Sequence, residues 1–159
     1  MKRLVSQFTK QLLEALEIGK SAKLKTNKKE ISSMVITGLG GSGIGGKIAT
    51  QIIAEQLKIP VIINNDYNLP EFVNENTLVI VSSFSGNTEE TLEALKKAQL
   101  AEAEIACITS GGKIAEIAKT KNYNLIILPK AFSPRAMLTY SIVQQLFLFN
   151  HYGLINDSF

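Results

Sequence analysis

The sequence predicts an α/β fold, a three-layer α-β-α sandwich in which a five-stranded parallel sheet is preceded by an N-terminal helix. Two patterns indicate it. Short runs rich in Val, Ile and Leu alternate with segments of helical periodicity, which is typical of an open sheet wrapped by helices. The runs are also mostly apolar on both faces, as parallel strands are. A chain of 159 residues, 45% hydrophobic and 19% charged, has room for one such domain.

The first segment is predicted to be an amphipathic helix that runs to about residue 24. One apolar face recurs at helical spacing and is formed by Leu4, Phe8, Leu12 and Leu16. A polar, lysine-rich joint follows, and after it the pattern changes to short apolar runs. We therefore assign residues 1–30 to an N-terminal helix and joint, and residues 31–155 to the domain itself.

The five predicted strands are residues 34–38, 60–64, 77–82, 104–109 and 124–129. The helical segments between them are marked by Ile44, Ile48 and Ile52, then by Leu92 and Leu95, then by Ile114 and Ile117. A last helix is predicted over residues 134–152, with Pro134 in its first turn. Because this helix is apolar nearly all round, we expect it to be central or covered by a partner.

Composition argues against several classes of protein. The net charge of +3 is small and scattered, so we expect no nucleic-acid partner. No window approaches a transmembrane span, and polar residues interrupt any signal-peptide core, so we expect no membrane partner. The single cysteine, Cys107, lies in an apolar run and is interpreted as a core residue. It cannot form an internal disulfide, which agrees with a reducing compartment and a cytoplasmic protein.

A glycine-rich loop follows the first predicted strand, with six glycines between residues 38 and 46. Residues 41–47 fit the Gly-x4-Gly-Lys part of a P-loop, but Ile48 stands where Ser or Thr would hold magnesium. Residues 38–43 fit the Gly-x-Gly-x-x-Gly of a dinucleotide-binding fold, and Asp66 follows the second strand at a suitable distance. Asp66 follows Asn64 and Asn65, however, and we prefer to interpret it as a turn residue. Glycine-rich runs match such templates by chance, so the residues at the other strand ends must decide which class of ligand is bound.

Small polar residues follow the third strand, namely Ser83, Ser85, Gly86, Asn87 and Thr88. The fourth strand ends in residues 109–113, again small and polar, and Arg135 follows the fifth. Ligands of open parallel sheets bind beyond the carboxyl ends of the strands, where helix N-termini attract anions. Carboxylates are scarce at these ends. The pattern therefore favours a small, hydroxyl-rich anion such as a phosphosugar, although Ser85 and Thr88 are also typical helix caps.

Four segments together resemble a known family: residues 38–46, 83–91, 108–114 and 134–140. They are similar to the N-terminal sugar isomerase (SIS) domain of bifunctional phosphoglucose/phosphomannose isomerases. The resemblance covers nearly the whole chain and implies a flavodoxin-like sheet topology. It also implies interconversion of glucose 6-phosphate or mannose 6-phosphate with fructose 6-phosphate through an enediolate, without metal or cofactor.

The resemblance assigns roles to six residues. Gly41 and Ser42 would contact the sugar, and the phosphate would be held by Ser83, Ser85 and Thr88. Arg135 would be catalytic, because its permanent charge and several donors suit an enediolate.

The family carries a second SIS domain, which supplies a glutamate for proton transfer and a histidine for ring opening, and the chain ends before any such segment. We therefore expect an incomplete, inactive half of the enzyme that forms a homodimer or pairs with a second SIS domain. A stand-alone module that senses a phosphosugar or binds a partner is the alternative, and a dinucleotide-binding Rossmann domain is another.

Overall fold

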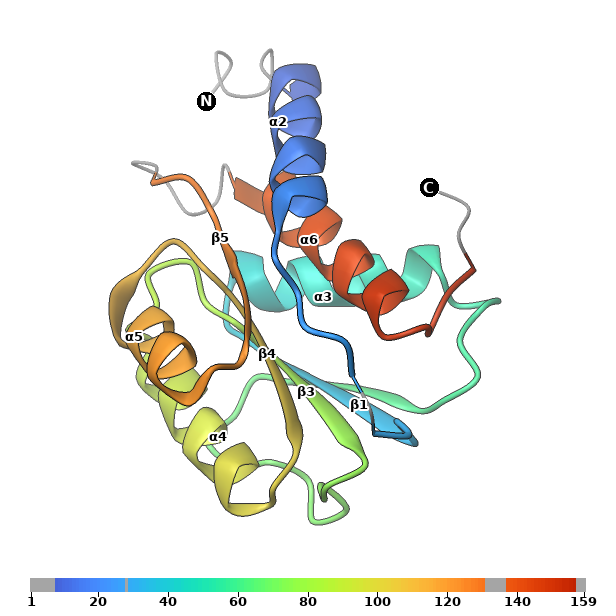
Figure 1. Ribbon diagram of the computed structural model, residues 1–159, viewed down its shortest axis with the longest axis vertical. Coiled ribbons are helices and arrows are strands. Elements are labelled where there is room, and N and C mark those ends of the chain that lie inside the picture. Colours follow the sequence, from blue (N-terminus) through green and yellow to red (C-terminus); the bar gives the residue numbers. More distant parts are fainter. Residues whose placement is uncertain (1–7, 28, 131–136, 157–159) are drawn as a thin grey trace.

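The computed structural model describes residues 8–27, 29–130 and 137–156. Its centre is a five-stranded parallel sheet in the order β2-β1-β3-β4-β5 (Figure 1). The strands are β1 Ser33–Thr37, β2 Val61–Asn64, β3 Thr77–Ser82, β4 Glu104–Thr109 and β5 Asn124–Ile127. The predicted α/β class and the flavodoxin-like strand order are both confirmed.

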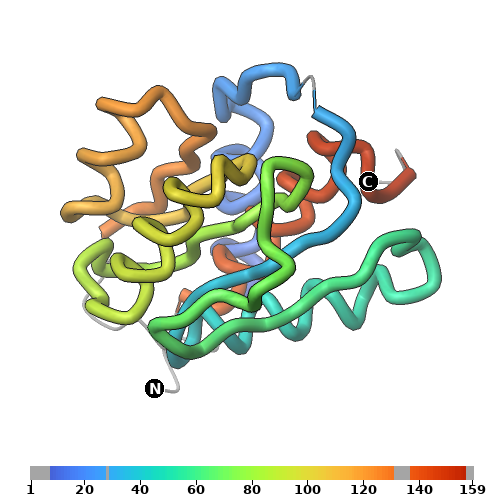
Figure 2. Tube along the Cα trace, turned by 90° about the horizontal axis from the view of Figure 1, so that it is seen from below, coloured from blue at the N-terminus to red at the C-terminus, as the bar shows by residue number. Residues whose placement is uncertain are grey.

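Five described helices surround the sheet: α2 Phe8–Ser21, α3 Gly41–Ile52, α4 Glu89–Leu100, α5 Gly112–Lys121 and α6 Leu138–His151. Alternate side chains of the strands divide the core in two. Met34, Ile36 and Ile80 face a cluster that contains residues of α2, α3 and α6. Val35 and Val79 face a cluster that contains residues of α4 and α5. The turned view in Figure 2 separates α4 and α5 from α3, so the three-layer prediction is confirmed.

Helix α6 lies between α2 and α3 on one face of the sheet (Figure 1). Its approach to α3 is close because the facing positions are glycines: a Cβ on Gly46 would lie 2.8 Å from Cγ2 of Ile36 and 3.1 Å from Oε1 of Gln145. On the other side, Phe147 packs directly against Gly19 of α2. Gln144 donates a hydrogen bond of 2.7 Å to the Ala15 carbonyl. The apolar side chains on several sides of α6 are thus explained by its central place, and the polar residues Ser141, Gln144 and Gln145 are buried with them.

The isoleucines of α3 face outward. Ile44 and Ile52 are exposed, whereas the buried face of this helix consists of Gly43, Gly45, Gly46 and Ala49. The apolar stripe that predicted this helix is therefore its outer face. Its inner face consists of small residues because α6 packs closely against it.

The joint after α2 crosses the amino ends of the strands and is tied there by polar contacts. Asn124 accepts a hydrogen bond of 2.7 Å from the Lys25 N–H, and Nε2 of His151 lies 2.7 Å from the Lys25 carbonyl. Lys29 donates to the Glu102 carbonyl at 2.8 Å. The carboxyl ends of the strands, at the opposite edge, are left to the loops that form the candidate site.

Cys107 lies on β4 and has no exposed surface, which confirms its interpretation as a core residue. Burial raises the pKa of its thiol to about 12, so the thiol is neutral at physiological pH and is no nucleophile. Among the described helices, none is both long and apolar enough to cross a membrane.

Candidate anion-binding site

The candidate site lies where the chain leaves β1 and β3, the two strands from which connections run to opposite faces of the sheet. Such a switch point opens a crevice beyond the carboxyl ends of the strands. It is flanked by the loops of residues 38–40 and 83–88, and the first of these closely approaches the end of β3, where the second begins. A Cβ on Gly38 would lie 2.5 Å from the Ser82 carbonyl oxygen, so only glycine allows this approach.

The β1–α3 loop presents backbone and one hydroxyl. Gly40 has φ +54°, and a Cβ there would meet no atom within 4 Å, so this part of the loop faces open space. Gly41 and Ser42 begin α3 and are half-buried. The Ser42 N–H donates to the Leu39 carbonyl at 3.1 Å, but its hydroxyl makes no hydrogen bond with the described residues. The structure thus places Gly41 and Ser42 where a ligand could reach them.

The β3–α4 loop is ordered around three hydroxyls. Oγ of Ser83 lies 2.9 Å from Oγ1 of Thr88 and accepts a hydrogen bond of 3.2 Å from the Gly86 N–H. Oγ of Ser85 accepts a hydrogen bond of 3.2 Å from the Asn87 N–H. Ser83 is only 2% exposed, whereas Ser85 is exposed and Thr88 half-buried. Two of the three predicted phosphate-binding residues, Ser83 and Thr88, are therefore in contact, with Ser83 underneath, and Ser85 is exposed in the same loop.

The capping alternative is wrong for Thr88. This residue is the N-cap of α4, yet its side chain makes no capping hydrogen bond and contacts Ser83 instead. Within the described chain, the N–H groups of Thr88, Glu89 and Glu90 have no hydrogen-bond acceptor. The first turn of a helix with unused N–H groups carries a partial positive charge, which is what an anion requires.

The first turn of α5 differs, because two of its N–H groups, those of Lys113 and Ile114, are already occupied. The Lys113 N–H donates to Oδ1 of Asn87 at 3.1 Å, and the Ile114 N–H donates to the Gly86 carbonyl at 3.0 Å. The sequence analysis predicted that the residues after β3 and those after β4 would both offer hydrogen-bond donors to a ligand, and it missed this role of Asn87. Its signal could not be read locally, since Asn87 caps a helix that begins 25 residues later.

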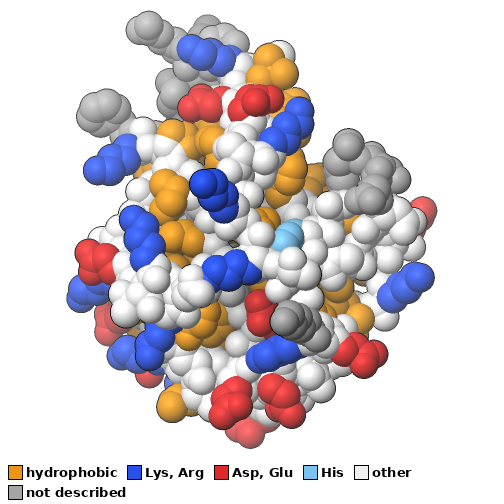
Figure 3. Space-filling view, viewed as in Figure 1, with side chains coloured by type: hydrophobic (Ala, Val, Ile, Leu, Met, Phe, Trp, Pro, Cys, Tyr) orange, Lys and Arg blue, Asp and Glu red, His pale blue; other side chains and the backbone are white. Residues whose placement is uncertain are grey.

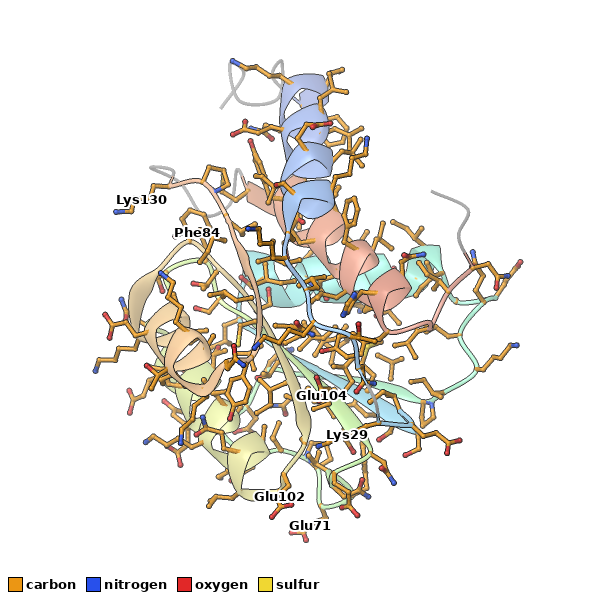
Figure 4. The ribbon with its side chains drawn as sticks, in the orientation of Figure 1. Lys29, Glu71, Phe84, Glu102, Glu104 and Lys130 are labelled. Atoms are coloured by element: carbon orange, nitrogen blue, oxygen red, sulfur yellow. The ribbon has the colours of Figure 1, made fainter. Side chains whose placement is uncertain are left out.

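Charged side chains of both signs surround the site. Lys113 and Lys130 are exposed, and Figure 4 shows Lys130 and Phe84 at this end of the molecule, away from Glu102 and Glu104. Glu89 and Glu90 lie in the first turn of α4. Together with desolvation, their negative charge raises the pKa of the Tyr67 hydroxyl, which follows β2.

Asp66, the residue on which the dinucleotide interpretation depends, is a turn residue. Its Oδ1 accepts a hydrogen bond of 2.6 Å from the Tyr67 N–H, and its carbonyl accepts one of 2.8 Å from Nδ2 of Asn64. Arg135, the predicted catalytic residue, lies outside the described residues. Among those that are described, no group of three or more His, Cys, Asp or Glu side chains is placed to hold a metal ion.

Comparison with known proteins places these loops in a family. The family model described as "SIS domain" matches residues 28–154. The chain is 46% identical over 151 residues to a bifunctional phosphoglucose/phosphomannose isomerase of Caldicellulosiruptor bescii. That match covers 95% of this chain but 44% of the relative, so the chain spans less than half the relative's length.

Two solved structures share the fold. The C-terminal domain of glucosamine-fructose-6-phosphate aminotransferase from Francisella tularensis superposes with a TM-score of 0.69 at 16% identity. The match covers 95% of this chain and 48% of that one. The Vibrio vulnificus NanR protein complexed with ManNAc-6P superposes with a TM-score of 0.59 at 15% identity, covering 92% and 53%.

Proposed function

The chain belongs to the SIS domain family, and we propose that it is the phosphosugar-binding half of a cytoplasmic aldose–ketose isomerase. Its substrates would be glucose 6-phosphate or mannose 6-phosphate and fructose 6-phosphate. The observation that carries the proposal is the set of unused N–H groups and hydroxyls beside the switch point. The isomerase names of curated relatives favour this function over a stand-alone sensor.

The phosphate is the part of the substrate that the described residues suit best. A phosphate dianion at the first turn of α4 would accept hydrogen bonds from the N–H groups of Thr88 and Glu89 and from the exposed hydroxyl of Ser85. Ser83 would orient the Thr88 hydroxyl from beneath. Gly41 and Ser42 would receive the sugar across the crevice, because a bare backbone lets hydroxyls approach closely.

We assign the chemical step to Arg135 and to a second SIS domain. Isomerisation removes a proton from C2 of the aldose and returns one to C1, through an enediolate whose negative charge a guanidinium would stabilise. The base must lie within hydrogen-bond reach of that proton. In this proposal the base is a carboxylate of the second domain, and this chain holds the substrate.

A separate apolar surface, distinct from the crevice, lies on the α2–α6 side. A pocket of about 490 Å³ between these helices is lined by apolar side chains that include Leu12, Leu16 and Leu146. Phe8 and Leu13 are more than half exposed on α2, and Figure 3 shows apolar side chains gathered over this helix. Helix α6 contains no Asp, Glu, Lys or Arg. An apolar face of this extent is typical of an interface.

The occupant that we propose is a second copy of this chain. Sedimentation at micromolar concentration should give a dimer, and Leu13→Glu should give a monomer, because a charge would be buried without a partner. Leu100→Glu is the matched control, since Leu100 is 85% exposed on the opposite layer at the end of α4. A monomeric parent protein, or equal effects of the two variants, would contradict this pairing.

The ligand proposal is tested by calorimetric titration with fructose 6-phosphate and with unphosphorylated fructose. The phosphorylated sugar should bind with a dissociation constant between about 1 µM and 1 mM, and fructose should not bind measurably. Ser85→Ala should weaken binding about tenfold, as expected for one hydrogen bond to a charged group.

Ser32→Ala is the matched control for that variant. Its hydroxyl bonds the Asn76 carbonyl at the amino end of the sheet, far from the site. Arg135→Ala should leave phosphosugar binding largely intact and act on catalysis when a second domain is supplied. Equal binding of both sugars, or an unchanged affinity in Ser85→Ala, would reject the phosphate site.

A further inference from the structure

The loops that follow β3 and β4 are joined along their whole length. Beyond the last paired residues of the strands, the Ser83 N–H donates to the Ile108 carbonyl and the Ser110 N–H donates to the Phe84 carbonyl, each at 3.0 Å. Farther on, the Ile114 N–H donates to the Gly86 carbonyl, also at 3.0 Å. The sheet pairing thus continues into the two loops, and the β3–α4 loop has a rigid neighbour.

One side chain in this contact has no role in either loop's own turn. Oγ of Ser110 donates to the Phe84 carbonyl at 2.7 Å, the shortest hydrogen bond between the two loops. The same carbonyl therefore accepts from both the N–H and the hydroxyl of Ser110, and the Thr109 hydroxyl is a more distant donor at 3.5 Å. A carbonyl with both lone pairs engaged is held in direction, not only in distance.

The direction of the Phe84 carbonyl fixes the direction of the next N–H. The carbonyl of Phe84 and the N–H of Ser85 belong to one planar trans peptide, so they point in opposite directions. The Ser85 N–H makes no hydrogen bond with the described residues. It is available to a ligand on the side of the loop away from Ser110.

From these contacts we propose that Ser110 is a positioning residue for the phosphate, acting through the Phe84–Ser85 peptide. The inference rests on the proposed function, because it assigns the Ser85 N–H to the same anion. Ser110 itself does not touch the ligand. Its hydroxyl prevents the peptide from rotating, so the Ser85 N–H is aimed before the phosphate arrives and no ordering is required on binding.

The test uses glucose 6-phosphate as the calorimetric probe and compares the parent protein with Ser110→Ala and Ser110→Thr. The alanine variant keeps the Ser110 N–H contact and therefore the fold, but loses the directional hydroxyl. We expect about tenfold weaker binding for alanine and affinity within about threefold of the parent for threonine, which restores the hydroxyl. Ser32→Ala, at the other end of the sheet, should change nothing.

A second readout separates positioning from a general loss of structure. Titration with inorganic phosphate should shift the amide resonance of Ser85 in the parent protein and in Ser110→Thr, and shift it much less in Ser110→Ala. The proposal is overturned if alanine binds within twofold of the parent, or if its Ser85 resonance responds normally. In those cases the proposed function stands. A parent protein that binds neither probe would overturn both.

Discussion

The β3–α4 and β4–α5 loops have the same architecture but opposite chemistry. Each follows a buried strand, contains a glycine with positive φ and leads into a helix. In α5 the N–H groups of Lys113 and Ile114 are taken by Asn87 and the Gly86 carbonyl, whereas those of Glu89 and Glu90 in α4 have no acceptor among the described residues. The difference shows that a helix N-terminus becomes a candidate anion site only when the protein leaves it unsatisfied.

The comparison also shows what satisfying one terminus achieves. Because α5 is capped by the β3–α4 loop, that loop is anchored to the body of the domain. The loop that would bind the ligand is thereby fixed in shape, which lowers the entropy lost on binding. The N-terminus of α5 holds the β3–α4 loop in place, and the N-terminus of α4 offers its N–H donors to a ligand.

The largest effect is expected from breaking the contact between the loops. Gly86 has φ +69°, and a Cβ there would collide with the Gly111 carbonyl oxygen. Gly86→Ala should therefore lower the free energy of unfolding by about 3 kcal/mol or more and abolish phosphosugar binding. Urea denaturation measures it. Gly153→Ala is the control, since a Cβ there has open space and incurs only backbone strain of about 1 kcal/mol at φ +68°. Similar losses in both variants would contradict the packing argument.

Thr88→Val should act mainly on the ligand. The change keeps the shape of the residue but removes the hydroxyl at the open helix start. Affinity for fructose 6-phosphate should fall about tenfold, while the free energy of unfolding changes by less than about 1 kcal/mol. Calorimetry and denaturation of the same preparation give both numbers. An unchanged affinity would show that the α4 terminus is not where the phosphate lies.

Asn87→Ala should show the converse, a change in stability larger than the change in affinity. It removes the cap of α5, which costs about 1 kcal/mol of unfolding free energy. Binding should weaken by less than about threefold, because the N–H donors of α4 remain. Thermal denaturation is the primary measurement, and Asn87→Asp, which also accepts a hydrogen bond from the Lys113 N–H, should recover the stability. A larger loss of affinity than in Thr88→Val would reverse the assignment of the two loops.

The smallest effect is expected from Lys113→Ala. Lys113 is exposed in the first turn of α5, where an anion would contact it if that terminus were the site. Because the N–H groups of Lys113 and Ile114 are occupied, phosphosugar affinity should change by less than about twofold, the size of a screened surface charge. A tenfold loss at physiological salt would move the site toward α5.

Much of the fold could be predicted because local sequence patterns indicate the helices and strands. The bounds of β3 and β4 agree with the predicted residues 77–82 and 104–109, since each is a short apolar run between polar turns. Periodicity located α3 from Ile44 and Ile52 but not its buried face, because that face is made of glycines.

The candidate site was predicted in part. Ser83 and Thr88 do come together, and Ser85 lies in the same loop before the helix. The unequal use of the two helix N-termini was not predictable, because it depends on Asn87 meeting Lys113, 26 positions away. Such contacts are set by the strand order and not by any local pattern. The role of Arg135, outside the described residues, stays a prediction.

The most direct test of the central claim is a crystal structure of the protein with fructose 6-phosphate. We predict that the phosphate oxygens lie within hydrogen-bond distance of the N–H groups of Thr88 and Glu89 and of the Ser85 hydroxyl, with the sugar toward Gly41 and Ser42. A phosphate bound at the first turn of α5, or at the amino end of the sheet, would contradict the claim.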